Sequence, residues 1–172
     1  MRRIFAVIGS TLFFLLAPFT VAGLIPFWIS HWHVEIKSFA WLPAEIVGSL
    51  LVAIGSVVLL DSFARFALKG LGTPAPVFPT RHLVVSGLYR FVRNPMYVAV
   101  LAVILGQALI FTSPRVLEYG AAVWLAFHLF VCLYEEPTLR RTFGAEYEAF
   151  CAGVPRWIPR AKPWKATSPI TE

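Results

Sequence analysis

Two short groups of residues in this chain have side chains that could act together on a ligand. Residues 93–97 read Arg-Asn-Pro-Met-Tyr and stand where a basic, proline-rich stretch meets an uncharged run. Asn-Pro is a favoured helix start, and a helix start beside an arginine suits an anionic group. The second group is Glu135 and Glu136, two adjacent carboxylates that would attract a cation. The pattern predicts a ligand site whose two halves lie far apart in the sequence.

The same side chains also have ordinary structural roles. The acidic pair can simply end a helix at a membrane interface, although the negative end of the helix dipole disfavours acids there. Arg90 and Arg93 can contact lipid phosphates, and Tyr97 can be an interfacial aromatic residue. Spacing alone leaves these alternatives open.

Two polar residues lie inside apolar runs. Gln107 is typical of a helix–helix hydrogen bond, whereas an intramembrane histidine such as His128 is a functional candidate. His128, Cys132 and Glu135 are spaced by four and three residues, which places them on one face of a helix.

Neither metal nor nucleic acid is an expected ligand. His31, His33 and Glu35 alternate beside tryptophans, a pattern more often interfacial than metal-binding, so no metal site is predicted. The formal net charge is +6, but the arrangement of the cationic residues indicates membrane topology and not a nucleic-acid surface.

The composition is that of an integral membrane protein. The 172 residues are 58% hydrophobic and 14% charged, with a mean hydropathy of +0.72, whereas a soluble domain has about 45–50% apolar and about 25% charged residues. We expect a single all-α domain over residues 1–172: a polytopic membrane bundle of four transmembrane helices, followed by a C-terminal amphipathic cytoplasmic helix. The expected spans are residues 4–30, 40–60, 95–112 and 116–135.

The distribution of charge predicts the orientation. Of the 15 lysines and arginines, all but Lys37 and Arg115 lie in the N-terminus, the link of residues 61–94 or the region after Pro137. The positive-inside rule therefore puts both termini and the central link in the cytoplasm, and we expect a multi-pass protein of the cell inner membrane.

The region after Pro137 is amphipathic, and Pro137 itself is expected to end the fourth span. Apolar residues recur there at spacings of four, four, three and four, which predicts one helix that lies on the membrane or against the ends of the spans: Leu139, Phe143, Tyr147, Phe150 and Val154. Residues 161–172 form a basic tail, and the chain from Arg160 is expected to be loose.

An antiparallel hairpin of the last two spans would join the two halves of the site. The third span rises about 27 Å from Pro95 and the fourth falls about 29 Å to Glu135. Arg93, Tyr97, Glu135 and Glu136 are therefore predicted to converge at the cytoplasmic level.

The motif of residues 87–97, Gly-Leu-Tyr-Arg-Phe-Val-Arg-Asn-Pro-Met-Tyr, followed after the hairpin by Glu-Glu-Pro, resembles the isoprenylcysteine carboxyl methyltransferases and their phospholipid methyltransferase relatives. The family pattern is Arg-His-Pro-x-Tyr, a hydrophobic stretch and then Glu-Glu. The resemblance covers residues 61–160 and includes Pro-Arg-Trp-Ile-Pro at 155–159. It departs at Asn94, where the family has histidine, which puts any acid–base role of that position in doubt.

The resemblance implies methyl transfer from S-adenosylmethionine to a lipidic or small apolar acceptor. Membrane lipids are expected as further partners. Carboxyl O-methylation is favoured; the alternatives are phospholipid or amine N-methylation and a non-catalytic lipid-binding or assembly protein. Catalytic roles are expected for Arg93, Glu136 and His128. The residues implied to line the cofactor site are Arg93, Asn94, Pro95, Tyr97, Glu135 and Glu136.

Overall fold

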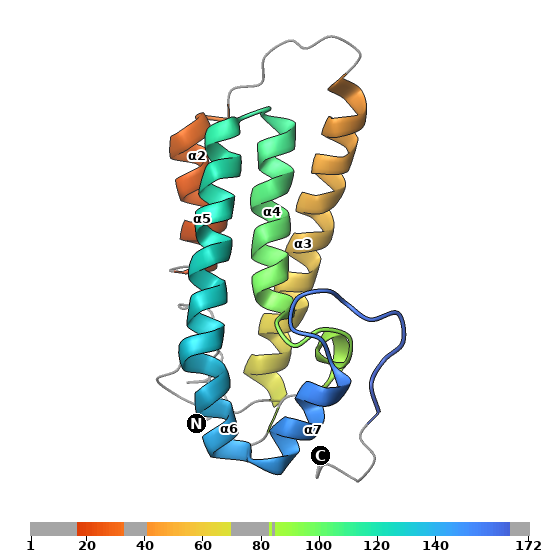
Figure 1. Cartoon of the computed structure of the whole chain (residues 1–172). Coiled ribbons are helices and arrows are strands. Elements are labelled where there is room, and N and C mark those ends of the chain that lie inside the picture. Colours follow the sequence, from red (N-terminus) through yellow and green to blue (C-terminus); the bar gives the residue numbers. More distant parts are fainter. Residues whose placement is uncertain (1–16, 33–40, 70–82, 84, 166–172) are drawn as a thin grey trace.

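The computed structural model describes residues 17–32, 41–69, 83 and 85–165. Every secondary-structure element assigned within these residues is a helix. The long helices α3, α4 and α5 run side by side as a bundle, with the short α2 beside the upper part of α5, and α6 and α7 lie at the lower end (Figure 1). In chain order the elements are η1 (Thr20–Leu24), α2 (Ile25–Ser30), α3 (Leu42–Lys69), η3 (Gly87–Arg90), α4 (Pro95–Ile110), α5 (Pro114–Phe130), η4 (Val131–Glu135), α6 (Glu136–Phe143) and α7 (Ala145–Gly153).

The expected third span agrees with α4, and Ser113 begins the next helix by accepting a hydrogen bond from the backbone N–H of Val116. The second helix, predicted for residues 40–60, is α3, and it continues to Lys69. The chain from Asp61 contains no glycine or proline before Gly70, so nothing local stops the helix where its composition turns polar.

Small residues let α3 and α4 approach closely. A Cβ added to Gly106 would lie 2.6 Å from the carbonyl oxygen of Gly48, and one added to Gly55 would lie 2.9 Å from the carbonyl oxygen of Ala99. These backbones are therefore in contact with no side chain between them, the packing that small residues permit between membrane helices.

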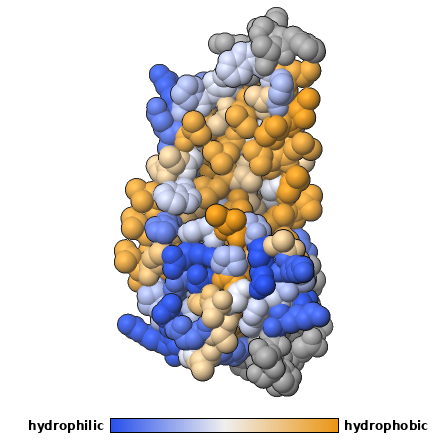
Figure 2. Space-filling model, turned by 45° about the vertical axis from the view of Figure 1, so that its right-hand side comes forward, coloured by the Kyte–Doolittle hydropathy of each residue, from blue (hydrophilic) through white to orange (hydrophobic). Residues whose placement is uncertain are grey.

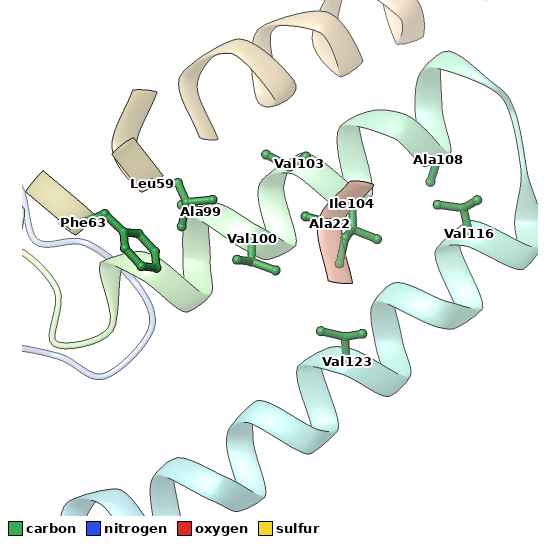
Figure 3. Packing of buried hydrophobic residues seen from close by; sticks show 10 residues of the cluster. All are labelled: Ala22, Leu59, Phe63, Ala99, Val100, Val103, Ile104, Ala108, Val116 and Val123. Carbon is green, nitrogen blue, oxygen red and sulfur yellow. The ribbon is translucent and has the colours of Figure 1, made fainter. Parts of the chain in front are cut away.

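The main hydrophobic core lies between α3, α4 and α5, with Ala22 contributed by η1 (Figure 3). Ile104 and Val116 are completely buried in it. This core places the start of α4 beside the end of α5, so it determines which residues meet at the lower end of the bundle.

A second, smaller core forms beneath the bundle and corrects two expectations. The predicted amphipathic helix is two helices, α6 and α7, because Gly144 adopts a φ of +51° and turns the chain between them. All five predicted face residues still share one cluster, together with Leu83, Val85, Cys151 and Trp164. Residues 160–165 are not loose: the backbone N–H groups of Arg160 and Trp164 donate to the carbonyls of Phe91 and Arg90, at 3.0 and 2.8 Å.

Pro137 does not end the fourth helix, contrary to the prediction. The helical chain continues from α5 through the π-helical turn η4 directly into α6, with Pro137 in the first turn of α6. Proline lacks an N–H and its ring collides with a carbonyl in a regular helix, and a wider π turn before it relieves both problems. The Glu135–Glu136 pair lies at this junction.

Two helices are long and apolar enough to cross a membrane, Leu42–Ala64 and Pro114–Phe143, while Thr20–Ser30 and Pro95–Ile110 are shorter apolar helices. The outer faces of α3 and α5 expose large apolar side chains, among them Ile54, Val57 and Leu125. Figure 2 shows apolar residues along much of the bundle, a small hydrophilic group at its upper left and a larger hydrophilic area across its lower part.

Candidate active site

The predicted convergence of the two groups is confirmed. The hydroxyl of Tyr97, on the first turns of α4, donates a hydrogen bond of 2.9 Å to Oε2 of Glu135, at the end of η4. The contact closes the α4–α5 hairpin at its lower end, as the lengths of the two helices require.

Glu136 lies beside this contact but has different partners. Arg156 donates to both of its carboxylate oxygens, from Nε at 2.6 Å and from Nη2 at 2.9 Å, and Nη1 of Arg93 lies 3.1 Å from Oε1. Glu136 is only 5% exposed, so two arginines compensate one buried carboxylate. The hydrogen bonds to Glu136 in turn raise the pKa of Arg156.

The C-terminal segment (residues 154–165) packs against the start of α4. The backbone N–H of Arg93 donates to the carbonyl of Pro155 at 2.9 Å. Asn94 begins α4, but its side chain makes no cap and instead donates from Nδ2 to the carbonyl of Arg156 at 3.2 Å. The expected side-chain cap is therefore replaced by a contact between segments, while Pro95 occupies the first turn as predicted.

A row of rings runs from the site along α5, and it consists of Phe127, Tyr97, Trp157, His128 and Trp124. Neighbouring ring centroids are 4.7, 6.5, 6.0 and 5.3 Å apart along this aromatic row. Nε1 of Trp157 donates to Nδ1 of His128 at 3.2 Å, and Nε2 of His128 lies 3.8 Å from Sγ of Cys132. The other polar residue within an apolar run, Gln107, makes the expected contact between helices, donating to the carbonyl of Ala22 at 2.6 Å.

Two further groups surround the site. Burial of the Tyr89 hydroxyl, and to a smaller extent the negative charge of Glu135, raises the pKa of Tyr89 above its ordinary value. Nε of Arg93 is buried and has no hydrogen-bond partner among the residues that the structure describes. A buried donor without a partner is costly, and a ligand acceptor would remove that cost.

The structure thus brings together Arg93, Asn94, Pro95, Tyr97 and the two glutamates, and connects His128 to them through Trp157. The sequence did not predict that Trp157 contributes to the site. The Pro-Arg-Trp-Ile-Pro motif was a signal that this stretch matters, but its position depends on how the second core folds the chain back. Cys151 was also missed; its Sγ accepts a 2.8 Å hydrogen bond from Nη1 of Arg93.

Comparison with known proteins shows the family to which the chain belongs. A family model described as phospholipid methyltransferase matches residues 44–146. A phosphatidylethanolamine N-methyltransferase of Phaeosphaeria nodorum (strain SN15) is 33% identical over 85 residues, which are 49% of this chain. The matched part covers only 9% of that relative. No solved structure matches the chain significantly.

Proposed function

Because the chain belongs to the phospholipid methyltransferase family, we propose that it is an integral membrane methyltransferase. The proposed reaction moves a methyl group from S-adenosylmethionine to the amine headgroup of a lipid. The observation that carries the proposal is the Tyr97–Glu135 contact, which joins the two halves of the family motif in one site.

The residues present fit S-adenosylmethionine, which carries a sulfonium, an ammonium and a carboxylate. Glu135 has only Tyr97 as a hydrogen-bond partner among the contacts of the described residues, so its carboxylate has capacity left for a cation. The unpartnered Nε of Arg93 and the start of α4 suit an anionic group or a hydroxyl. When bound, S-adenosylmethionine supplies a methyl group on a positively charged sulfur.

An amine acceptor must lose a proton before its nitrogen lone pair can form the new N–C bond. Glu135 is the proposed proton acceptor. Of the other candidates, Glu136 has both oxygens paired with Arg156. His128 accepts from Trp157 at Nδ1, so the neutral ring carries its own proton on Nε2. Glu136 then serves to hold Arg93 and the C-terminal segment.

Carboxyl O-methylation, favoured by the sequence, has less support. A carboxylate acceptor needs a free cation near the methyl group. Arg156 is engaged with Glu136, and the one unpartnered donor of Arg93 is assigned in this proposal to the cofactor. The family match and the named relative also concern phospholipid and phosphatidylethanolamine methylation.

We also propose that all four apolar helices cross the membrane, with both termini and the site on the cytoplasmic side of a cell inner membrane. The support is the charge distribution and the position of the site at one end of the bundle. A lipid acceptor would then enter from the bilayer and a water-soluble cofactor from the cytoplasm.

Calorimetric titration of S-adenosylmethionine into the purified chain tests the cofactor site. Glu135→Gln should weaken binding by about tenfold to a hundredfold, the effect of losing one charged hydrogen bond. Glu118→Gln, an exposed carboxylate at the other end of α5, is the matched control and should bind as the wild type does. The absence of S-adenosylmethionine binding by the wild type would contradict the proposal that the chain is a methyltransferase.

Transfer of labelled methyl groups then identifies the acceptor. Vesicles of phosphatidylethanolamine should become labelled, and a prenylated cysteine peptide should not. Labelling of the peptide alone would contradict N-methylation, and labelling of neither, despite cofactor binding, would favour a non-catalytic lipid-binding protein.

A further inference from the structure

The part of the aromatic row nearest the site forms a corner that none of the assigned roles explains. The rings of Tyr97 and Trp157 have centroids 6.5 Å apart and planes inclined at 59°. They come from α4 and from the C-terminal segment, so the corner exists only when that segment is in place. The Tyr97 hydroxyl, at the edge of this corner, is bound to the carboxylate of Glu135.

This corner has the properties of a site for an alkylated cation. A cation is attracted to the face of an aromatic ring when it lies within about 6 Å of the centroid, and indole gives the strongest attraction. Because the two centroids are 6.5 Å apart, one group can satisfy this condition for both rings. The Glu135 carboxylate adds a negative charge beside the Tyr97 hydroxyl. A sulfonium has no N–H to donate, and each methyl group on an ammonium removes one N–H donor, so the faces of aromatic rings become the better partners.

His128 holds the tryptophan in this position. Trp157 Nε1 donates to His128 Nδ1 at 3.2 Å, and the imidazole is itself stacked on Trp124, with planes inclined at 22°. An indole with its only donor committed to a packed neighbour has a restricted ring orientation. Trp157 is half-buried, so part of its ring remains available to a ligand.

We infer that Trp157 is a specificity-determining wall for an onium group, and that His128 is the positioning residue that orients it. The inference rests on the proposed function and deepens it, since the reaction offers two onium groups. One is the sulfonium of S-adenosylmethionine, and the other is the ammonium of a partly methylated lipid headgroup. Both present the same chemistry to the rings.

The first experiment compares S-adenosylmethionine with S-adenosylhomocysteine, which has a neutral thioether in place of the sulfonium. Each ligand is titrated into the full chain in detergent, as wild type, Trp157→Phe and Trp157→Leu. If the wall contacts the sulfonium, Trp157→Leu weakens S-adenosylmethionine binding about fivefold to tenfold. The same change leaves S-adenosylhomocysteine binding within about twofold, and Trp157→Phe falls between them. Trp28→Leu, an exposed tryptophan in α2, is the matched control.

The second experiment addresses the lipid. Michaelis constants are measured for phosphatidylethanolamine and for its dimethylated form in mixed micelles. If the wall contacts the headgroup, Trp157→Leu raises the constant for the dimethylated lipid by about fivefold more than that for the unmethylated lipid. The ratio of affinities for the two adenosyl ligands then stays as in the wild type.

The role of His128 has its own readout. His128→Leu should reproduce the selectivity change of Trp157→Leu, whereas His128→Gln, which keeps an acceptor, should restore most of it. If Trp157→Leu does not fold, the comparison of His128→Leu with His128→Gln still tests the onium wall. If both ratios stay at the wild-type value in the Trp157 and His128 variants, the onium wall is excluded while the proposed function stands. If the wild type binds neither adenosyl ligand, the proposed function fails and the inference fails with it.

Discussion

The two adjacent glutamates show how neighbours of the same type can differ in role. Glu135 meets a tyrosine hydroxyl, while Glu136 is held by two arginines from separate parts of the chain. Consecutive residues on a helix point about 100° apart, so the two side chains reach different neighbours at the junction of η4 and α6. The role of Asn94 also depends on its surroundings, since its side-chain amide donates a hydrogen bond to the C-terminal segment and does not cap its own helix.

The Arg156–Glu136 pair should be a stabilising contact. Arg156→Gln leaves a buried carboxylate with fewer donors, and we expect a loss of about 1–3 kcal/mol in the free energy of unfolding. Arg140→Gln is the matched control, because Arg140 pairs with Glu148 at 3.3 Å where both side chains are about half exposed, and such pairs contribute about 0–1 kcal/mol. Thermal unfolding in detergent measures both, and equal midpoints would contradict the role given to Glu136.

At the scale of elements, the close contact of α3 and α4 supports everything below it. Gly48 and Gly106 place two backbones in direct contact, and the second core then holds α6, α7 and the C-terminal segment under the start of α4. Tyr97 and Trp157 can therefore meet only if both packing layers are intact.

Enlarging Gly106 should separate these two helices. Gly106→Ala puts a methyl group 2.6 Å from a backbone oxygen, which cannot move without its helix, so we expect a destabilisation of about 1–3 kcal/mol. Gly23→Ala is the control, because its added Cβ meets only the ring of Phe19 at 3.5 Å, an ordinary contact. Unfolding of both variants under the same conditions provides the comparison, and a Gly106→Ala variant as stable as Gly23→Ala would show that the helices are not in contact there.

At the scale of the whole molecule, an apolar bundle carries its polar site at one end. The long apolar helices α3 and α5 expose large apolar side chains on their outer faces, and α6 and α7, which carry charged residues, lie at the lower end of the bundle. This division would allow the proposed lipid acceptor to approach from the bilayer and the proposed water-soluble cofactor from the aqueous side.

Reporter fusions in a bacterial membrane test the proposed orientation. Alkaline phosphatase fused after Thr112, in the α4–α5 turn, should be active because it reaches the outer side, and the same enzyme fused after Gly153 should be inactive. A fluorescent protein fused at the C-terminus should be fluorescent, whereas phosphatase fused there should be inactive. Phosphatase activity after Gly153 would contradict the cytoplasmic position of the site.

The sequence by itself determined the all-helical fold, the α4–α5 hairpin and the convergence of Tyr97 with Glu135. These depend on composition, on local helix signals and on the constant rise of a helix, all of which are readable along the chain. Only the tertiary structure decided that Arg156 binds Glu136, that Trp157 reaches His128 and that the helix continues through Pro137. The two contacts depend on how the second core folds the chain back onto α4, and contacts between segments far apart leave no periodic signal in the sequence. The continuation through Pro137 depends on the π-helical turn that precedes it.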